Sequence, residues 1–147
     1  EFGAERRGAP VKAYTRVSDK QVLTRSPIIN PDIVVVLDMS IDKKIYLDGL
    51  KVGGTLLVNS SKSKSELLQS IEREDVLVAK VDATHIALEE LGAAIVNTSM
   101  VGALMKVSSI AKLDSISEAI RDNFRPKIAE ANIRAATRAY NEVEVIN

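Results

Sequence analysis

Three short runs of hydrophobic residues predict the strands of a buried sheet. Residues 33–37 read IVVVL between Asp32 and Asp38, and residues 55–58 and 76–81 are also largely apolar. Strands of antiparallel sheets usually alternate apolar and polar residues, whereas a parallel strand that is covered on both faces does not. We therefore expect these three runs to lie side by side in a mainly parallel sheet.

Helical patterns alternate with these strands along the chain. A short helix is predicted over residues 41–50, and Ser63 with Glu66 forms a capping-box pattern ahead of an apolar stretch. Residues 83–91 carry an apolar stripe at helical spacing. This alternation predicts an α/β fold, a three-layer Rossmann-like domain with helices on both faces of the sheet.

The N-terminal part has a weaker pattern that alternates between apolar and polar positions. Residues 10–17 alternate in this way, turn-forming residues occupy positions 18–20, and residues 22–24 are again extended in character. Two extended segments joined by a short turn are typical of a hairpin. We therefore expect an edge hairpin at one side of the sheet.

The last third of the chain contains only helical patterns. A helix is predicted over residues 96–107, and Ser115 with Glu118 forms a second capping-box pattern that we expect to open another helix. Pro126 suits the first turn of a final, alanine-rich helix. No strand is predicted here, so we expect a helical C-terminal third that covers the sheet or forms an interface.

Composition narrows the class of protein. Lys plus Arg equal Asp plus Glu at 20 each, so the chain lacks the positive field that nucleic-acid binders use. No apolar run approaches the roughly 20 residues of a membrane span, and the first residues lack the pattern of a signal peptide. We expect a single cytoplasmic domain over residues 1–147, with no membrane and no nucleic-acid partner.

The sequence also excludes several kinds of chemistry. The chain has no cysteine, which excludes thiolate nucleophiles, disulfides and Cys-bound iron–sulfur clusters on these residues. Gly53-Gly54 precedes a predicted strand, whereas a phosphate loop opens a helix, so we interpret this pair as the stop of the 41–50 helix. His85, the single histidine, lies four residues before Glu89, and this spacing favours a solvated ion pair over general-base chemistry.

Two polar clusters remain as candidate sites. Asn97-Thr98-Ser99 stands at the expected start of the 96–107 helix, where it either caps the helix or gathers groups that bind an anion or a carbonyl. The cap is the simpler interpretation. The opening run Glu5-Arg6-Arg7-Gly8 combines two guanidinium groups with a glycine that permits close backbone approach. It is either an exposed charged edge or a site for phosphate or carboxylate, and the residues alone leave both open.

Several separate stretches of the chain resemble one family. They are residues 3–11 (GAERRGAPV), 17–20 (VSDK), 81–84 (VDAT), 86–92 (IALEELG) and 96–103 (VNTSMVGA). In this order they resemble the gamma subunit of pyruvate (2-oxoacid):ferredoxin oxidoreductases over essentially the whole chain. The full R-R-G-A-P form of the opening run favours pyruvate or branched-chain 2-oxoacids over the related 2-oxoglutarate and indolepyruvate families.

The resemblance implies an enzyme subunit that is inactive in isolation. The implied reaction is the oxidative decarboxylation of a 2-oxoacid, with the acyl group passed to coenzyme A and the electrons passed to ferredoxin. Thiamine diphosphate, Mg and the iron–sulfur clusters are expected on alpha, beta and delta-type partner subunits, and no cofactor is expected on this chain. The family's first strand and its G-R-G-G-Q-G loop are absent from this sequence, so we expect the domain to be N-terminally incomplete.

The resemblance also implies where the candidate residues lie. They are expected near a subunit junction that faces the active site, where the arginines meet the coenzyme A phosphates or a partner carboxylate. These residues are Glu5, Arg6, Arg7, Gly8, Asn97 and Thr98. No catalytic residue and no metal ligand are expected on this chain. A stand-alone small-molecule or nucleotide-binding α/β domain is the alternative, and a pure assembly scaffold is a third possibility.

Overall fold

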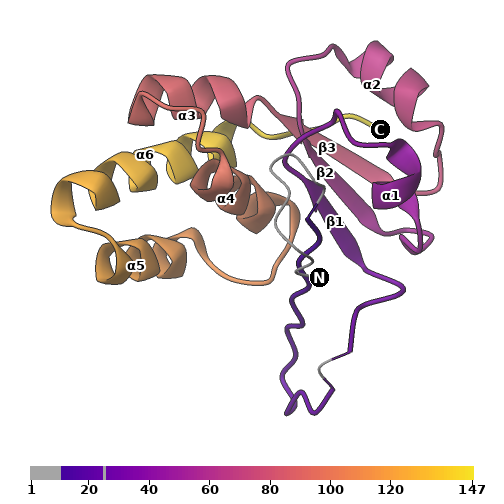
Figure 1. Ribbon diagram of the computed structural model, residues 1–147, viewed down its shortest axis with the longest axis horizontal. Helices are drawn as coiled ribbons and strands as arrows, with labels where there is room; N and C mark the ends of the chain where they lie inside the picture. Colours follow the sequence, from indigo (N-terminus) through magenta and orange to yellow (C-terminus); the bar gives the residue numbers. More distant parts are fainter. Residues whose placement is uncertain (1–10, 25) are drawn as a thin grey trace.

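A four-stranded sheet forms the centre of the computed structural model, which describes residues 11–24 and 26–147 (Figure 1). Its strands, in spatial order, are β1 (Ile33–Val36), β2 (Thr55–Asn59), β3 (Leu77–Val81) and β4 (Glu144–Val145). The first three are parallel, and β4 runs antiparallel to β3. The prediction of three buried strands in a mainly parallel sheet is confirmed.

Two short helices cover one face of the sheet. They are α1 (Lys43–Leu47), which follows β1, and α2 (Lys64–Ile71), which follows β2. The Ser63 hydroxyl accepts the Glu66 N–H at 3.4 Å, and the Glu66 carboxylate accepts the Ser63 N–H at 2.9 Å, which confirms the predicted capping box. Leu67 of α2 is fully buried in the core between these helices and the sheet.

The α1 helix ends earlier than the sequence pattern predicts. It stops at Leu47, and Gly49 adopts the left-handed backbone with a φ of 73°. A Cβ atom at Gly49 would meet the Ile29 carbonyl oxygen at 1.9 Å, so the close approach of the preceding loop requires glycine there. Gly53-Gly54 instead form the turn into β2, where the Gly53 N–H donates to the Asp75 carbonyl at 2.7 Å. The prediction that this pair ends the helix is wrong.

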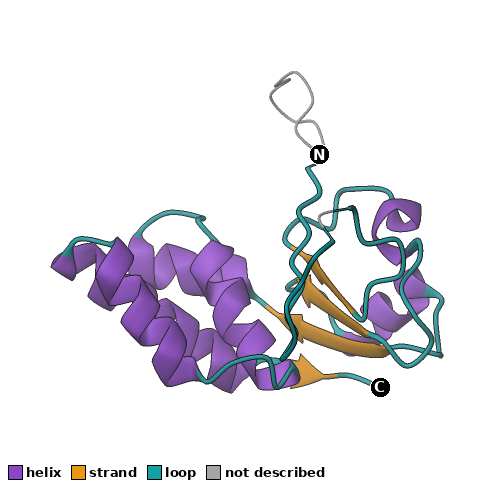
Figure 2. Cartoon of the chain, turned by 90° about the horizontal axis from the view of Figure 1, so that it is seen from below, coloured by secondary structure: helices purple, strands orange, loops and turns teal. Residues whose placement is uncertain are grey.

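Three helices cover the opposite face of the sheet. They are α3 (Ala83–Leu91), α4 (Asn97–Val107) and α6 (Pro126–Glu142), and small side chains of all three contribute to a second core. Helices α4 and α6 pack so closely that a Cβ atom at Gly102 would lie 2.0 Å from the Ala136 carbonyl oxygen. Helices on both faces confirm the predicted three-layer α/β arrangement (Figures 1 and 2).

The helical C-terminal third is confirmed, although one of its helices begins earlier than predicted. Helix α5 (Leu113–Asn123) packs on α6, and Lys112 occupies its N-cap position without a side-chain hydrogen bond. Ser115 therefore lies inside the helix, and the prediction that it caps α5 is wrong. Leu113 and Ile116 both pack against the core between α5 and α6, which favours the earlier start. Pro126 stands in the first turn of α6, as predicted.

The chain ends in a strand that the sequence analysis missed. Val145 pairs with Ala79, and the Ile146 N–H donates to the Val78 carbonyl at 2.9 Å. The Asn147 side chain extends this ladder, because its Oδ1 accepts the Val78 N–H and its Nδ2 donates to the Val76 carbonyl, both at 2.7 Å. A strand of two residues is too short to show a periodic pattern, which explains why it was not predicted.

The described residues between 11 and 32 form a projection that we call the N-terminal arm (Figure 1, indigo). Within the described part of the chain, residues 13–24 contain no strand and make no backbone–backbone hydrogen bond. The predicted edge hairpin is therefore not formed there. Residues 11–24 are exposed throughout, and a two-stranded hairpin without a packed face is marginal in water.

Candidate functional site

The first predicted group, Glu5-Arg6-Arg7-Gly8, lies outside the described residues, so its role stays a prediction. The N-terminal arm that follows it carries exposed apolar side chains: Val17 is 63% exposed, and Leu23 and Ile29 are each 80% exposed. Several such side chains on one projection are typical of a surface that meets another protein. The opening run is thus joined in sequence to a segment with the character of an interface.

The second predicted group, Asn97 and Thr98, lies in the first turn of α4. The Thr98 hydroxyl donates to the Asn132 Oδ1 at 2.7 Å, and the Asn132 Nδ2 donates to the Ile128 carbonyl at 2.9 Å. Asn132 is only 6% exposed, so these bonds join α4 to α6 within the protein. Asn97 is exposed at the same helix end, and among the described residues its side chain makes no hydrogen bond. Asn97 is therefore the member of the pair whose side chain is open to a partner.

The predicted helix cap at Asn97-Thr98-Ser99 is wrong. Val96 occupies the N-cap position of α4, and no side chain caps the helix. Ser99 is fully buried, and its hydroxyl has no hydrogen-bond partner among the described residues. The helix begins at Asn97, one residue after the predicted start at 96. Three consecutive polar residues favour a cap, but the tertiary packing uses their side chains differently.

The carboxyl ends of the parallel strands are held together by an asparagine that sequence reasoning missed. Such strand ends are the usual ligand-binding edge of an open α/β sheet. The Asn59 Nδ2 donates to the Leu37 carbonyl and to the Thr84 hydroxyl, both at 2.9 Å, and its Oδ1 accepts the Thr84 N–H at 3.2 Å. Asn59 thereby links the ends of β1 and β2 to the start of α3. The signal available in the sequence was an amide residue directly after an apolar run.

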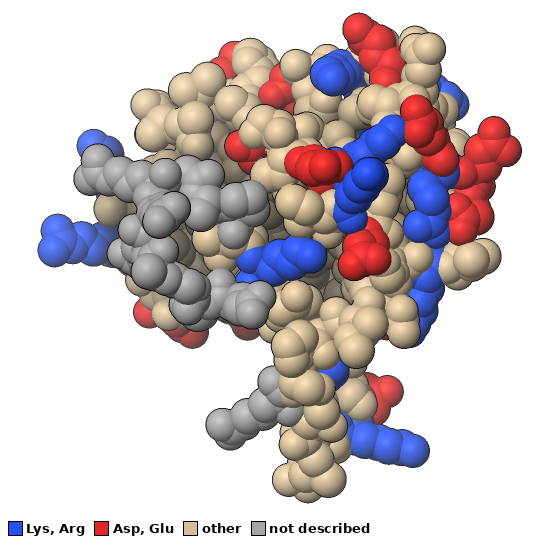
Figure 3. Space-filling model, turned by 45° about the vertical axis from the view of Figure 1, so that its right-hand side comes forward, with Lys and Arg blue, Asp and Glu red and all other residues tan. Residues whose placement is uncertain are grey.

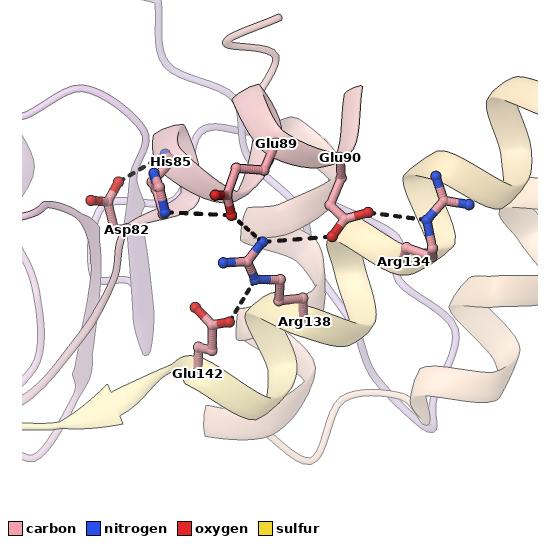
Figure 4. Close-up of polar contacts among 7 residues, drawn as sticks. All are labelled: Asp82, His85, Glu89, Glu90, Arg134, Arg138 and Glu142. Atoms are coloured by element: carbon pink, nitrogen blue, oxygen red, sulfur yellow. Dashed lines mark hydrogen bonds and ion pairs between the residues drawn. The ribbon is translucent and has the colours of Figure 1, made fainter. Parts of the chain in front are cut away.

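Helices α3 and α6 are joined by a network of charged side chains (Figure 4). The His85 Nε2 lies 3.4 Å from the Glu89 carboxylate, which confirms the predicted pair. Glu89 also accepts a hydrogen bond from Arg138, and this bond lowers the pKa of the Glu89 carboxyl below its ordinary value. The Arg138 Nε donates to Glu142 at 2.6 Å, and together these contacts raise the pKa of Arg138. The arrangement is an exposed structural network, and no serine or cysteine belongs to it.

The face formed by α1 and the end of α2 carries an open groove of about 680 Å³. Its lining combines the apolar Ile45 and Ile71 with charged residues, among them Lys43 and Arg73. Lys43 pairs with Glu72 at 2.6 Å, and Arg73 forms a two-pronged contact with Asp75 at 2.6 and 2.7 Å. Basic and acidic side chains lie next to one another on this side of the molecule (Figure 3). Two of the cations that line the groove, Lys43 and Arg73, are thus matched by carboxylates.

The described residues, 11–24 and 26–147, contain neither a cluster suited to a metal ion nor a membrane-spanning helix. Within them, no group of three or more His, Cys, Asp or Glu side chains is placed to hold a metal ion. In the same part of the chain, no helix combines the length and apolar character that a membrane crossing requires.

The architecture defines a three-layer α/β domain of the kind found in oxidoreductase subunits. The pyruvate oxidoreductase subunit PORC of Thermotoga maritima superposes with a TM-score of 0.74 at 38% identity, over 80% of this chain and 66% of that chain. The gamma subunit of a keto/oxoacid ferredoxin oxidoreductase from Geobacter sulfurreducens gives 0.61 at 20% identity, over 76% of this chain and 63% of that chain, and shows the shared fold.

The family follows from the sequence match. The model of the pyruvate ferredoxin/flavodoxin oxidoreductase family matches residues 1–142, and the chain belongs to this family. The resemblance that the sequence motifs indicated is confirmed.

Curated relatives agree with this assignment. The pyruvate/ketoisovalerate oxidoreductases common subunit gamma of Pyrococcus furiosus is 47% identical over 145 residues, which is 98% of this chain and 78% of the relative. The same-named subunit of Thermococcus litoralis is 46% identical with the same coverage. The pyruvate synthase subunit PorC of Methanocaldococcus jannaschii is 42% identical over 143 residues, 97% of this chain and 76% of the relative.

Proposed function

We propose that this chain is the gamma subunit of a pyruvate or branched-chain 2-oxoacid:ferredoxin oxidoreductase. The complex oxidatively decarboxylates a 2-oxoacid, transfers the acyl group to coenzyme A and passes the electrons to ferredoxin. The observation that carries the proposal is the identity of 46 to 47% over 98% of this chain with subunits named gamma. Their name, the common subunit gamma of pyruvate/ketoisovalerate oxidoreductases, supports both substrate classes.

The redox and decarboxylation chemistry is assigned to partner subunits of alpha, beta and delta type in the cytoplasm. Iron–sulfur clusters need thiolate ligands, and this sequence has no cysteine. Thiamine diphosphate and Mg are assigned to the same partners, and this chain contributes to the junction beside them. The isolated chain is accordingly inactive.

The contribution of this chain centres on the opening run. Arg6 and Arg7 bind the coenzyme A phosphates or a partner carboxylate, because guanidinium groups match both anions with paired hydrogen bonds. Glu5 and Gly8 belong to the same junction. Asn97 offers an exposed amide at the start of α4, and Thr98 acts there through its bond to Asn132, which fixes the helix.

Reconstitution of the complex tests the proposal. This chain is co-expressed with alpha, beta and delta-type subunits of such an oxidoreductase, and ferredoxin reduction is measured with coenzyme A and either pyruvate or 3-methyl-2-oxobutanoate. We expect the chain to co-purify with its partners and turnover to require it. A complex that forms and turns over equally well without this chain contradicts the proposal.

The arginines are tested in the same complex. Arg6→Ala and Arg7→Ala should raise the KM for coenzyme A, whereas Lys20→Ala, which removes one exposed positive charge from the N-terminal arm, should leave it unchanged. An unchanged KM in both arginine variants, with the complex intact, rules out the phosphate role.

A further inference from the structure

The N-terminal arm carries an apolar surface that the described body of the chain leaves uncovered. The arm extends away from the sheet and its helices (Figure 1), and residues 11–24 are exposed throughout. Large hydrophobic side chains recur along it, with exposed fractions of 71% at Val11, 63% at Val17, 45% at Val22, and 80% at Leu23 and Ile29. Single exposed hydrophobic residues are ordinary on a protein surface, but a row of them on one projection indicates a contact surface.

The main chain of the arm is open as well. Residues 11–24 make no backbone–backbone hydrogen bond within the described part of the chain. Another polypeptide can supply the missing partners from its own backbone or polar side chains. A lipid bilayer offers no such partners, so a segment inserted there would leave its N–H and C=O groups unsatisfied. The open main chain therefore favours a protein over a membrane surface as the occupant of this contact.

Arg16 holds the arm in a closed shape before any partner binds. Its Nη1 donates to the carbonyl of Thr24 at 3.1 Å and to that of Ser26 at 2.8 Å, and its Nη2 donates to the carbonyl of Pro27 at 3.4 Å. The planar guanidinium suits such a set of converging acceptors. Because these bonds join the outgoing part of the arm to its returning part, less conformational freedom is lost on docking, and the affinity for a partner is higher.

The charge of the arm indicates the chemistry of that partner. Residues 11–31 contain four basic residues and one acidic residue, Asp19, whereas the whole chain has a net charge of 0. The arm is therefore positively charged in a chain whose remainder is not. A groove with an apolar floor and a rim of carboxylates matches both the hydrophobic side chains and the charge of the arm.

A second copy of this chain matches the arm less well. The open groove beside α1 and α2 is the depression on the described body into which an arm would fit. Its lining contains four basic residues and two acidic ones, namely Lys12, Lys43, Lys44 and Arg73 against Asp48 and Glu72. A groove with an excess of positive charge does not attract a positively charged arm. The charges therefore favour a different chain as the partner.

We propose that the N-terminal arm is a docking element that inserts into an apolar, carboxylate-rimmed groove of another subunit of the oxidoreductase. Hydrophobic side chains of the arm, chiefly Val17 and Leu23, fill the groove, and the basic residues of the arm face its rim. This role rests on the proposed function, because the multi-subunit enzyme supplies the partner. The arm itself is assigned no contact with substrate or coenzyme A.

The binding test uses the reconstituted complex, and native mass spectrometry over a range of concentrations measures the Kd of this chain for the partner subunits. Val17→Asp and Leu23→Asp should each raise the Kd by roughly tenfold or more, because each places a charge in a desolvated contact. Val52→Asp is the matched control, since Val52 is 81% exposed on the body, and it should leave the Kd nearly unchanged. An unchanged Kd in both arm variants overturns the proposal.

The charge of the groove is tested by a variant that should bind more tightly. Asp19→Lys removes the acidic residue of the arm and should lower the Kd by roughly two- to fivefold at low ionic strength, with a smaller gain in high salt. Asp122→Lys makes the same change at an exposed position of α5 and should have little effect. If Asp19→Lys raises the Kd or leaves it unchanged, the carboxylate rim is wrong.

Hydrogen–deuterium exchange locates the contact. The amides of residues 11–24 have no backbone–backbone hydrogen bond among the described residues, so they should exchange rapidly in the free chain and slowly in the complex. Amides of the arm that exchange equally fast in the complex overturn docking, even if the Kd of an arm variant has changed.

Two further outcomes would assign the arm to another occupant and overturn the proposal. One is a dimer of the free chain, detected by light scattering, that Leu23→Asp separates. The other is binding of the free chain to vesicles of phosphatidylcholine and phosphatidylserine that Leu23→Asp abolishes. If the unaltered chain fails to associate with the partner subunits, the proposed function itself has failed. Normal assembly of both arm variants contradicts only the docking role.

Discussion

The first strand and the N-terminal arm contain similar residues but lie in different surroundings. β1 reads IVVV, and the arm carries Val17, Val22 and Leu23. Val36 of β1 is 3% exposed and belongs to a ladder with β2, whereas Val17 is 63% exposed and has no ladder partner among the described residues. The difference shows that β propensity expresses itself as a strand only where a neighbouring strand and a packed face are present.

The same contrast applies to the way each region is held together. Packing dominates in the body, where the α4 and α6 backbones approach so closely that Gly102 leaves no room for a Cβ atom. Three hydrogen bonds from one exposed arginine close the arm. Shortening a densely packed side chain lowers stability strongly because it leaves a cavity. Shortening an exposed side chain lowers stability little because water fills the space.

The largest expected effect is the difference in stability between alanine substitutions of a buried and an exposed leucine. Leu67→Ala removes a fully buried side chain from the core beneath α2 and should lower the free energy of unfolding by about 2–5 kcal/mol. Leu23→Ala, on the arm, changes a side chain that is 80% exposed and should stay within about 0.5 kcal/mol. Denaturant unfolding of both variants measures the difference. Equal losses would mean that the arm is packed in solution and would remove the contrast between the two regions.

A smaller effect is expected between two neighbouring polar residues of α4. Thr98→Val removes the donor to Asn132 and leaves a nearly buried acceptor unsatisfied. This change should lower the free energy of unfolding by about 1–3 kcal/mol. Thr98→Ser keeps the hydroxyl and should recover most of this loss. Ser99→Ala deletes a buried hydroxyl without a partner among the described residues, so unfolding should show no loss or a slight gain in stability. A large loss in Ser99→Ala would show that its hydroxyl is in fact bonded.

The smallest effect concerns pH and the exposed network between α3 and α6. The hydrogen bond from Arg138 lowers the pKa of Glu89 below its ordinary 4.5, so this contact stabilises the folded state at neutral pH. The contribution is present above about pH 4.5 and is lost as the pH falls through the lowered pKa of the folded state. The difference in Tm between the unaltered chain and Arg138→Leu should therefore be constant from pH 6 to 8 and shrink in acid.

A matched control separates this network from general acid effects. Arg121→Leu removes an exposed arginine that pairs with Glu130 at 3.2 Å on α5 and α6, away from Glu89. The Tm difference between the unaltered chain and Arg121→Leu should be small, and it should change less in acid than the difference for Arg138→Leu. A Tm difference for Arg138→Leu that does not depend on pH would mean that the contact with Arg138 does not lower the pKa of Glu89.

Much of the body was predictable because its elements have strong local signals. The continuous runs at 33–37, 55–58 and 76–81 became β1, β2 and β3, and the Ser63 capping box formed as predicted. The start of α5 was not predictable from its capping pattern. The Ser115 pattern is equally good locally, but packing of Leu113 and Ile116 against α6 extended the helix past it.

The candidate site was less predictable than the fold. Sequence patterns selected Asn97 and Thr98 correctly as polar residues at the start of a helix, but they did not show that the Thr98 hydroxyl is used by Asn132, 34 positions away. Asn59 was missed for the same reason, because its partners Leu37 and Thr84 come from other elements. The opening run lies outside the described residues, so its role still rests on the family resemblance.

The sequence by itself determined the α/β class, the parallel strands and the family, because β-branched runs, helical spacing and ordered motifs are local properties of the chain. Only the tertiary structure decided which extended segments became strands. Residues 144 and 145 joined the sheet because β3 lay beside them, and residues 13–17 remained without a ladder because no described strand did. Pairing and burial join residues that are distant in sequence, and local patterns do not record those contacts.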